Sequence, residues 1–246
     1  MKTDKFQRRF YRDQVSAKDL FKLTVSVKET DVTILSNKPI DKDCAVKQIT
    51  FYRNQIESYI DKDRRFLVSL KPLAVELNAP PIVKKMAAAA RSAGVGPMAA
   101  VAGAIAECLG REFLRQGFKD IIIENGGDIF LKLSRPCKVS IYTGRSKLWK
   151  GLGIKILPQK RPVGICTSSS TIGHSLSFGR ADSAVILAKD AALADAVATA
   201  TCNRVQDKKS LAPALEFARS VGGVFGAVII FKNNLASFGE EFEFLK

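Results

Sequence analysis

The sequence lacks the patterns that mark several common classes of protein. Its five cysteines, spread from Cys44 to Cys202, form no Cys-x-x-Cys pair, which argues against a disulfide scaffold and a zinc cluster. No apolar run reaches the roughly 20 residues of a membrane span, because the longest apolar-rich stretch, 94–109, is mostly Ala and Gly and contains Glu107. The basic N-terminal stretch has no apolar h-region behind it, which argues against a secretory signal. We therefore expect a cytoplasmic protein with no membrane partner.

What is present fits a globular domain. With 246 residues, 46% of them apolar and 26% charged, the chain can bury a full core. No repeat or Pro/Gly-rich linker divides it, so we expect one domain over 1–246. Hydrophobic periodicity predicts strands and helices. The expected strands lie near 21–27, 32–34, 66–70, 121–123, 130–133, 139–142, 152–156, 163–166, 184–187, 224–231 and 235–238, and the expected helices near 43–60, 80–90, 97–116, 190–201 and 210–221. Hairpins mixed with paired helices predict an α+β fold with mixed or antiparallel sheets.

The net charge of +15 is unevenly distributed. Nine basic residues and no acidic residue lie between Lys132 and Arg161, which indicates an anionic partner. That partner could be nucleic acid or a smaller phosphorylated molecule steered by the same field. A solvated face that only keeps the protein soluble is the third interpretation. Aromatic residues make up only 8% of the chain, so base stacking lacks a platform and nucleic acid is the less favoured partner.

The first of three segments that packing alone does not explain is Glu124-Asn125-Gly126-Gly127-Asp128. Asn-Gly accepts the positive φ angles of a tight primed turn, so one interpretation is a β-hairpin. That interpretation leaves the second glycine and Asp128 without a reason. Two consecutive glycines would also let a ligand lie on the backbone, with amide N–H groups forming an anion nest. Asn125, Gly126, Gly127 and Asp128 are therefore candidate ligand-binding residues.

The second segment places five consecutive hydroxyl groups after a predicted strand and is followed by the only histidine, His174. Hydroxyls and free amides at the end of a strand suit phosphate, whereas the alternative is an ordinary polar loop. The candidate phosphate ligands are Thr167, Ser168, Ser169 and Ser170. His174 is the candidate catalytic residue because its unperturbed pKa lies near neutrality. Cys166, beside this segment, is typical of a small buried hydrophobic residue, with a nucleophile as the less favoured alternative.

The third segment is Ala194-Asp195-Ala196-Val197-Ala198-Thr199, on a predicted helix. Asp195 and Thr199 are four residues apart, so they project from one helix face about one turn apart. A carboxylate and a hydroxyl are hard oxygen ligands suited to Mg²⁺. The alternative is an Ala-rich packing helix in which the Thr199 hydroxyl bonds back to its own turn.

In this order the three segments resemble the FAD:protein FMN transferase family, the ApbE-like proteins. Members carry a Gly-Gly-Asp after a strand, a Thr-Ser-Gly segment followed by a histidine, and an Ala-Asp-Ala-x-x-Thr-Ala helix. The matching residues are Asn125-Gly126-Gly127-Asp128-Ile129, Thr167-Ser168-Ser169 with His174, and Ala194-Asp195-Ala196-Val197-Ala198-Thr199-Ala200. The resemblance is strongest to a group of short, uncharacterised prokaryotic relatives, whose signature the stretches 94–103 and 124–128 resemble.

The resemblance implies an ApbE-like fold, an FAD or other nucleotide-like ligand, and Mg²⁺ for moving FMN onto a threonine of an acceptor protein. By resemblance Asp195 and Thr199 hold the metal, with a backbone carbonyl between Gly96 and Met98 as a third ligand. The expected activity is a metal-assisted transferase or hydrolase acting on an anionic small molecule. A homodimer is compatible with the sequence.

Two departures separate the chain from the transferases. They carry Lys-Gly within the helix segment that corresponds to 96–103, where this chain has only small apolar residues, and their histidine precedes an Asp-Pro-x-x-Gly stretch that is absent after His174. Flavin-contacting residues are therefore not carried over. The alternatives are a nucleic-acid-binding module built on 132–161 and a ligand-binding relative without catalysis.

Overall fold

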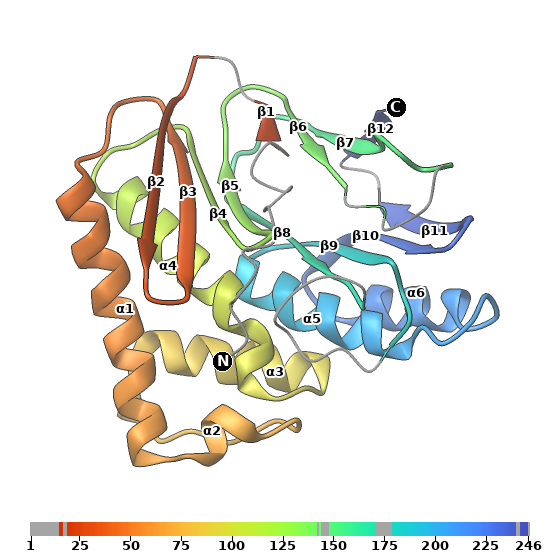
Figure 1. Ribbon diagram of the computed structural model, residues 1–246, viewed down its shortest axis with the longest axis horizontal. Coiled ribbons are helices and arrows are strands. Elements are labelled where there is room, and N and C mark those ends of the chain that lie inside the picture. Colours follow the sequence, from red (N-terminus) through yellow and green to blue (C-terminus); the bar gives the residue numbers. More distant parts are fainter. Residues whose placement is uncertain are drawn as a thin grey trace, which may run out of the picture.

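The computed structural model describes residues 15–16, 19–141, 143, 148–170, 179–239 and 242–245. Within these residues eight strands form one antiparallel sheet, in the order β11-β10-β9-β8-β5-β4-β3-β2, and four form a second, in the order β1-β6-β7-β12 (Figure 1). The large sheet contains β2 (Phe21–Val27), β3 (Thr30–Ser36), β4 (Ile121–Asn125), β5 (Asp128–Lys132), β8 (Val163–Ser168), β9 (Ser183–Ala188), β10 (Val224–Phe231) and β11 (Asn234–Gly239). The small sheet contains β1 (Val15–Ser16), β6 (Cys137–Ser140), β7 (Gly153–Ile156) and β12 (Phe242–Leu245).

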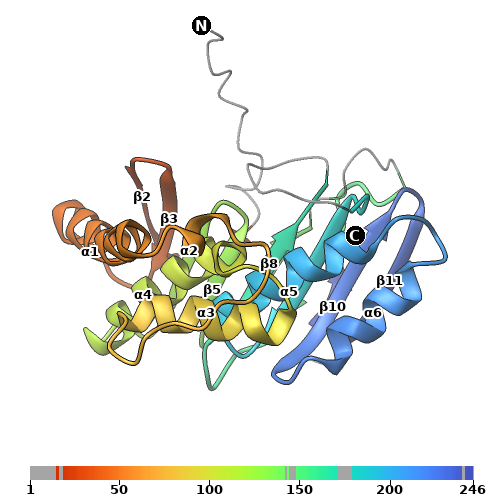
Figure 2. The same cartoon turned by 90° about the horizontal axis from the view of Figure 1, so that it is seen from below.

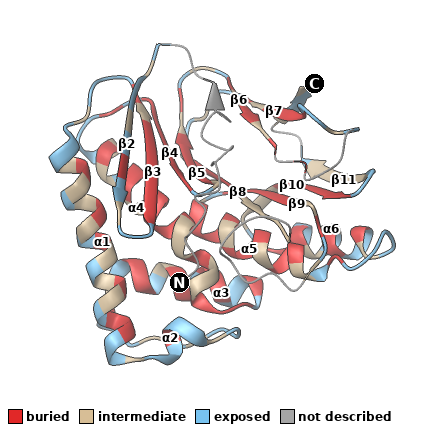
Figure 3. Cartoon of the chain, in the orientation of Figure 1, coloured by how far each residue is buried: buried red, intermediate tan, exposed pale blue. Residues whose placement is uncertain are grey.

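The helices cover one face of the large sheet and the small sheet lies over the other, so the molecule has three layers (Figures 1 and 2). The helical elements are α1 (Lys42–Lys62), α2 (Arg65–Val68), α3 (Pro81–Ala93), a short 3₁₀ helix η2 (Pro97–Ala100), α4 (Val101–Arg115), α5 (Ala191–Arg204) and α6 (Leu211–Ser220). Helix α5 lies in the middle of this layer. Ten of its 14 residues are buried (Figure 3), which explains its richness in alanine.

The two faces of the central strands build two separate cores. Successive side chains of a strand point to opposite faces of a sheet. Ile123 of β4 and Phe130 of β5 therefore pack against the helices, whereas Ile122 and Ile129 pack against the small sheet. The continuous apolar run 121–123 thus belongs to a strand that is covered on both sides. The α+β fold class predicted from the sequence is confirmed, with every described strand pairing antiparallel.

Helix α4 crosses α5 at very short range because Gly103 has no side chain. A Cβ atom at Gly103 would lie 2.3 Å from the backbone oxygen of Ala191 and 2.7 Å from the Cβ of Asp195. A helix face of small residues therefore lets the backbone of α5 come close. The contact places the first turn of α4 directly against Asp195.

The strand predicted at 66–70 is wrong. This segment forms the one-turn helix α2, in which Phe66 is fully buried while Leu67 and Val68 are exposed. Phe66 packs edge-on against Tyr59 of α1, with 5.1 Å between ring centroids. One buried aromatic anchors a single turn here, and no neighbouring strand is needed. The sequence also gave no indication of the two-residue strand β1 or of β12.

Among the described helices, none alone is long and apolar enough to cross a bilayer. Only α3 together with the η2–α4 segment would pass by length and composition, and that pair is bent by 104°.

Candidate functional site

The three segments singled out in the sequence meet at one end of the central strands of the large sheet. Strand β4 ends at Asn125, β5 begins at Asp128 and β8 ends at Ser168. The register pairs Asn125 with Asp128, and Asp128 with Cys166. Helix α5, which carries Asp195, packs against β8 and α4 just below this end (Figure 1). Residues 70 positions apart in the sequence therefore converge.

Gly126 and Gly127 form the two-residue tip of the β4–β5 hairpin. Their φ angles are +68° and +103°, as a primed turn requires. No atom lies within 4 Å of a Cβ built at either glycine, so the tip is open. The Gly127 N–H is donated to Glu124 Oε1 at 2.8 Å. The hairpin interpretation is confirmed. The Gly127 N–H, already bonded to Glu124, is not available as a donor to a bound anion.

Substituting Gly127 with alanine should leave a folded protein that is less stable by about 1–2 kcal/mol, because an L-residue is strained at this φ. Nothing would clash with the added methyl group. Denaturant unfolding of the variant, with Gly222→Ala as a control at a glycine whose φ is not positive and whose added Cβ is equally free of contacts, measures the difference. A global collapse of the structure would show that the tip is buried against something.

Asp195 is half-buried and its carboxylate sits at the N-terminus of helix α4. The N–H of Gly103, third residue of α4, donates to Asp195 Oδ2 at 2.9 Å. Burial raises the pKa of Asp195 to about 7, although the backbone N–H groups of Gly103 and Ala102 act in the opposite direction. Helix N-termini attract anions, and at α4 that anion is Asp195 itself.

Asp128 is buried close to Asp195. Burial raises the pKa of the Asp128 carboxyl well above its usual value, and the negative charge of Asp195 raises it further. Its Oδ1 atom is buried and has no hydrogen-bond partner among the described residues. A buried carboxyl beside a half-buried one is stabilised by a shared proton or by a cation. The unpartnered oxygen makes this pair the candidate centre of the site.

The remaining predicted ligands of a cation lie close to α5. Thr199, one helical turn beyond Asp195, is half-buried on α5. The η2 helix, which holds Met98, also packs against α5. Packing alone explains why position 96 is glycine, since a Cβ there would lie 1.7 Å from the backbone oxygen of Ser69. Within the described residues no group of three or more His, Cys, Asp or Glu side chains is arranged to hold a metal, so a cation here would rely on hydroxyl or carbonyl oxygens as well.

The hydroxyl-rich segment is only partly described. Thr167 and Ser168 end strand β8, and both are half-buried, as are Ser169 and Ser170. The Ser170 hydroxyl donates to the Ala181 carbonyl at 2.7 Å, which links the residues after β8 to those before β9. His174, the predicted catalytic residue, lies outside the described residues.

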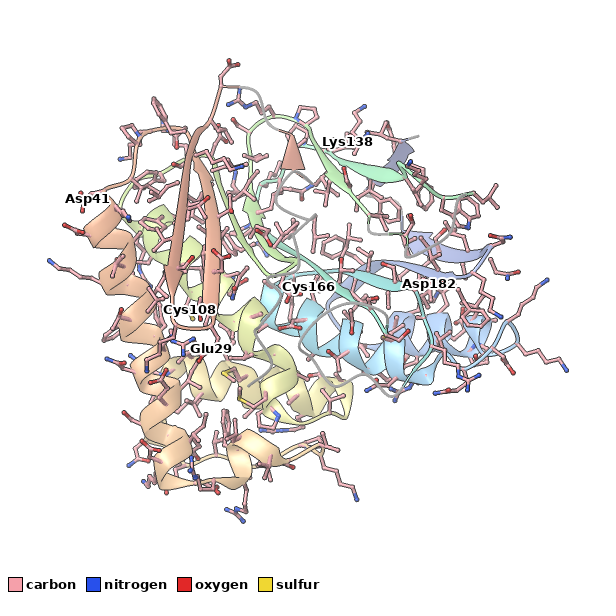
Figure 4. The ribbon with its side chains drawn as sticks, in the orientation of Figure 1. Glu29, Asp41, Cys108, Lys138, Cys166 and Asp182 are labelled. Carbon is pink, nitrogen blue, oxygen red and sulfur yellow. The ribbon has the colours of Figure 1, made fainter. Side chains whose placement is uncertain are left out.

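Cys166 has the environment of a core residue (Figure 4). It is fully buried, and its thiol donates to the Ala191 carbonyl at 3.2 Å. Burial raises the pKa of this thiol well above its usual value. Because the thiolate is the nucleophilic form, the structure favours the buried-hydrophobe interpretation.

The basic segment contributes two strands, β6 and β7, to the small sheet, and Lys138 on β6 is labelled in Figure 4. Lys138 of β6 faces Lys155 of β7 across the sheet. Lys155 pairs with Glu243 at 3.0 Å and Arg135 approaches Asp19 at 3.6 Å. Acids from distant parts of the sequence thus offset part of a charge that looks uncompensated along the chain.

Two contacts at the site were not foreseen. The Asn125 side-chain amide donates to the Ala102 carbonyl at 3.1 Å, tying the hairpin to α4. Glu107 of α4 is fully buried and accepts from the Ala191 N–H at 2.8 Å. The sequence feature that could have indicated a role for Glu107 is its position as the single acidic residue of the Ala/Gly-rich stretch 94–109.

The family described as "AbpE bacteria" matches residues 12–221. A UPF0280 protein from Methanocella arvoryzae is 42% identical over 214 residues, covering 87% of this chain and 86% of that protein. Another from Methanospirillum hungatei is 46% identical over 177 residues, covering 72% of each.

Two solved structures have the same fold. The flavin transferase ApbE from Vibrio cholerae superposes with a TM-score of 0.58 at 15% identity, covering 89% of this chain and 96% of that chain. The apo form of the Pseudomonas stutzeri flavinyl transferase ApbE gives a TM-score of 0.58 at 12% identity, covering 89% and 93%. The chain therefore belongs to the AbpE bacteria family, has UPF0280 proteins as relatives and shares its fold with the ApbE flavin transferases.

Proposed function

We propose that the protein binds a divalent cation at the Asp128–Asp195 pair together with a nucleotide-like diphosphate such as FAD, and that it acts as a metal-assisted transferase or hydrolase. The observation that supports this most is the buried Asp128 Oδ1 atom without a partner, next to a second carboxylate. A buried oxygen without a partner calls for an explanation, and a bound ion or a catalytic role is one that fits a second carboxylate nearby.

The donor set fits Mg²⁺ better than a softer metal. Asp128, Asp195 and Thr199 offer hard oxygens, and Mg²⁺ usually binds through one or two carboxylates while phosphate and water complete its shell. No thiolate ligand is needed, because the Cys166 thiol donates to the Ala191 carbonyl and also bonds to Asp128, a contact that partly opposes the burial that raises the pKa of that carboxyl. A divalent cation held there would neutralise charge on a diphosphate and on its leaving group.

The surrounding residues would hold the ligand and orient it. Neither helix N-terminus near the site is free for phosphate, because Asp195 occupies that of α4 and Asp190 and Glu107 occupy that of α5. The open tip at Gly126 and Gly127 lets a ligand approach the backbone. The hydroxyls of Thr167 and Ser168 at the end of β8 are the remaining donors at that end of the sheet. The acceptor would be water or a partner protein.

The test is incubation of purified protein with FAD in the presence of Mg²⁺ or EDTA. Native mass spectrometry measures bound nucleotide, and chromatography measures AMP released by cleavage of the diphosphate. Binding and AMP release should both require Mg²⁺ and be lost in Asp128→Asn. The control Asp61→Asn removes an exposed acid of α1 whose side chain is 80% accessible and should behave as the wild type. The proposal would be contradicted if the protein, in the presence of Mg²⁺, retained no FAD and no other adenine or flavin nucleotide.

A further inference from the structure

Glu107 does not touch the acidic pair, yet it is linked to it through two crossing helices. Its carboxylate is fully buried between α4 and α5. One oxygen accepts from the N–H of Ala191, the first residue of α5, at 2.8 Å. The other accepts from Arg111 one turn further along α4. Asp195 lies about one turn into the helix whose start Glu107 holds.

Each of the two helices carries a carboxylate that accepts a hydrogen bond from the N-terminal turn of the other helix. Glu107 of α4 binds the first N–H of α5, and Asp195 of α5 binds the N–H of Gly103 near the start of α4 at 2.9 Å. The first N–H groups of a helix have no partner within the helix and carry partial positive charge. Each carboxylate therefore fixes the helix opposite to it, and a shift of either helix would disturb both bonds.

The first residue of α5 is also enclosed by close backbone contacts. A Cβ at Gly103 would lie 2.3 Å from the Ala191 oxygen, and a Cβ at Gly164 would lie 2.4 Å from the Ala191 Cα. The Cys166 thiol donates to the same Ala191 oxygen. Glu107 is the side chain of α4 that accepts from the Ala191 N–H. The N-cap residue Asp190 accepts from the Leu193 N–H at 2.9 Å, so two carboxylates hold the start of α5.

We propose that Glu107 is a positioning residue for the site: by holding the start of α5, it keeps Asp195 against Gly103 and beside Asp128. The expected effect on metal binding rests on the proposed function, whereas the expected shift of α5 does not. Side chains that orient a metal ligand without touching the metal commonly alter affinity by about 10–100-fold when they are changed.

The geometric test follows the Gly103 amide by NMR in metal-free protein. Glu107→Leu keeps similar bulk and removes the acceptor, so α5 should shift and the Gly103 amide resonance should move more than any amide of the β2–β3 hairpin. Glu107→Gln keeps one oxygen that can accept from Ala191 and should show a smaller displacement. Arg111→Gln removes only the half-exposed partner and should leave Gly103 in place.

The functional test measures Mn²⁺ binding by the same proteins at a temperature where all are folded. Glu107→Leu should bind Mn²⁺ about 10–100-fold more weakly than the wild type, Glu107→Gln should recover most of the affinity, and Arg111→Gln should match the wild type. A merely structural role would lower the melting temperature without changing the dissociation constant.

The two failures are distinguishable. Wild-type protein that binds no Mn²⁺ would sink the proposed metal site, and the Gly103 resonance would then decide the role of Glu107 alone. An unchanged Gly103 amide resonance in Glu107→Leu overturns the positioning role. If the leucine variant does not fold, an unchanged resonance in Glu107→Gln overturns it instead. So does unchanged Mn²⁺ affinity in a folded Glu107→Leu protein.

Discussion

Mg²⁺ at about one hundred times its dissociation constant should raise the free energy of unfolding of the wild-type protein by about 2.7 kcal/mol, as for any ligand that binds only the folded state. Asp195→Asn should abolish this stabilisation. The amide oxygen of asparagine can still accept from the Gly103 N–H, so the fold is retained while the charge that attracts the cation is removed. Thermal unfolding with and without Mg²⁺ measures the effect.

Thr199→Val provides a graded comparison for the same experiment. It removes the hydroxyl one turn from Asp195 and keeps a β-branched side chain of similar shape, so Mg²⁺ stabilisation should weaken but persist. Asp61→Asn, far from the site on α1, should respond to Mg²⁺ as the wild type does. An equal rise in stability in the wild type and in Asp195→Asn would show that the cation binds somewhere else.

The parts of the fold that follow from periodicity were predictable from the sequence. Helix α3 begins at Pro81 and ends at Ala93, just before Gly94, whose φ is +71°, as Pro at a helix start and Gly just past its end indicate. The β4–β5 hairpin followed from Asn-Gly. The one-turn helix α2 did not, because its single buried residue, Phe66, is too short a pattern to distinguish a helical turn from a strand end.

The candidate site was predictable only in part, for a physical reason. The chemistry of Asp128, Asp195 and Thr199 is visible in their residue types, and the helix spacing of the last two is local. Which partners satisfy them depends on contacts between distant segments, such as Gly103 with Asp195, 92 residues apart. Sequence alone therefore indicated a cation site but not that Asp195 also accepts from an N–H near the start of α4, nor that Glu107 accepts from the first N–H of α5.

The acidic pair should also make the metal-free protein less stable as the pH rises from about 4 to about 7. Burial raises the pKa of Asp195 to about 7 in the folded state, whereas an unfolded aspartate titrates near 3.9. Between these values the folded protein keeps a proton that the unfolded chain has lost. Stability then falls with increasing pH by at most about 1.4 kcal/mol per pH unit, and levels off above pH 7. The raised pKa of Asp128 acts in the same direction.

Urea unfolding at a series of pH values in EDTA, for the wild type and Asp195→Asn, measures this contribution as the difference between two curves. Asparagine cannot titrate, so the variant should lose part of the downward slope and gain relative stability toward pH 7. Adding Mg²⁺ should reverse the trend in the wild type, because a cation binds the ionised carboxylate and its affinity rises until the pair has lost its protons. Parallel curves for the two proteins in EDTA would mean that Asp195 is ionised throughout, with its charge already balanced by the N–H groups at the start of α4 rather than awaiting a cation.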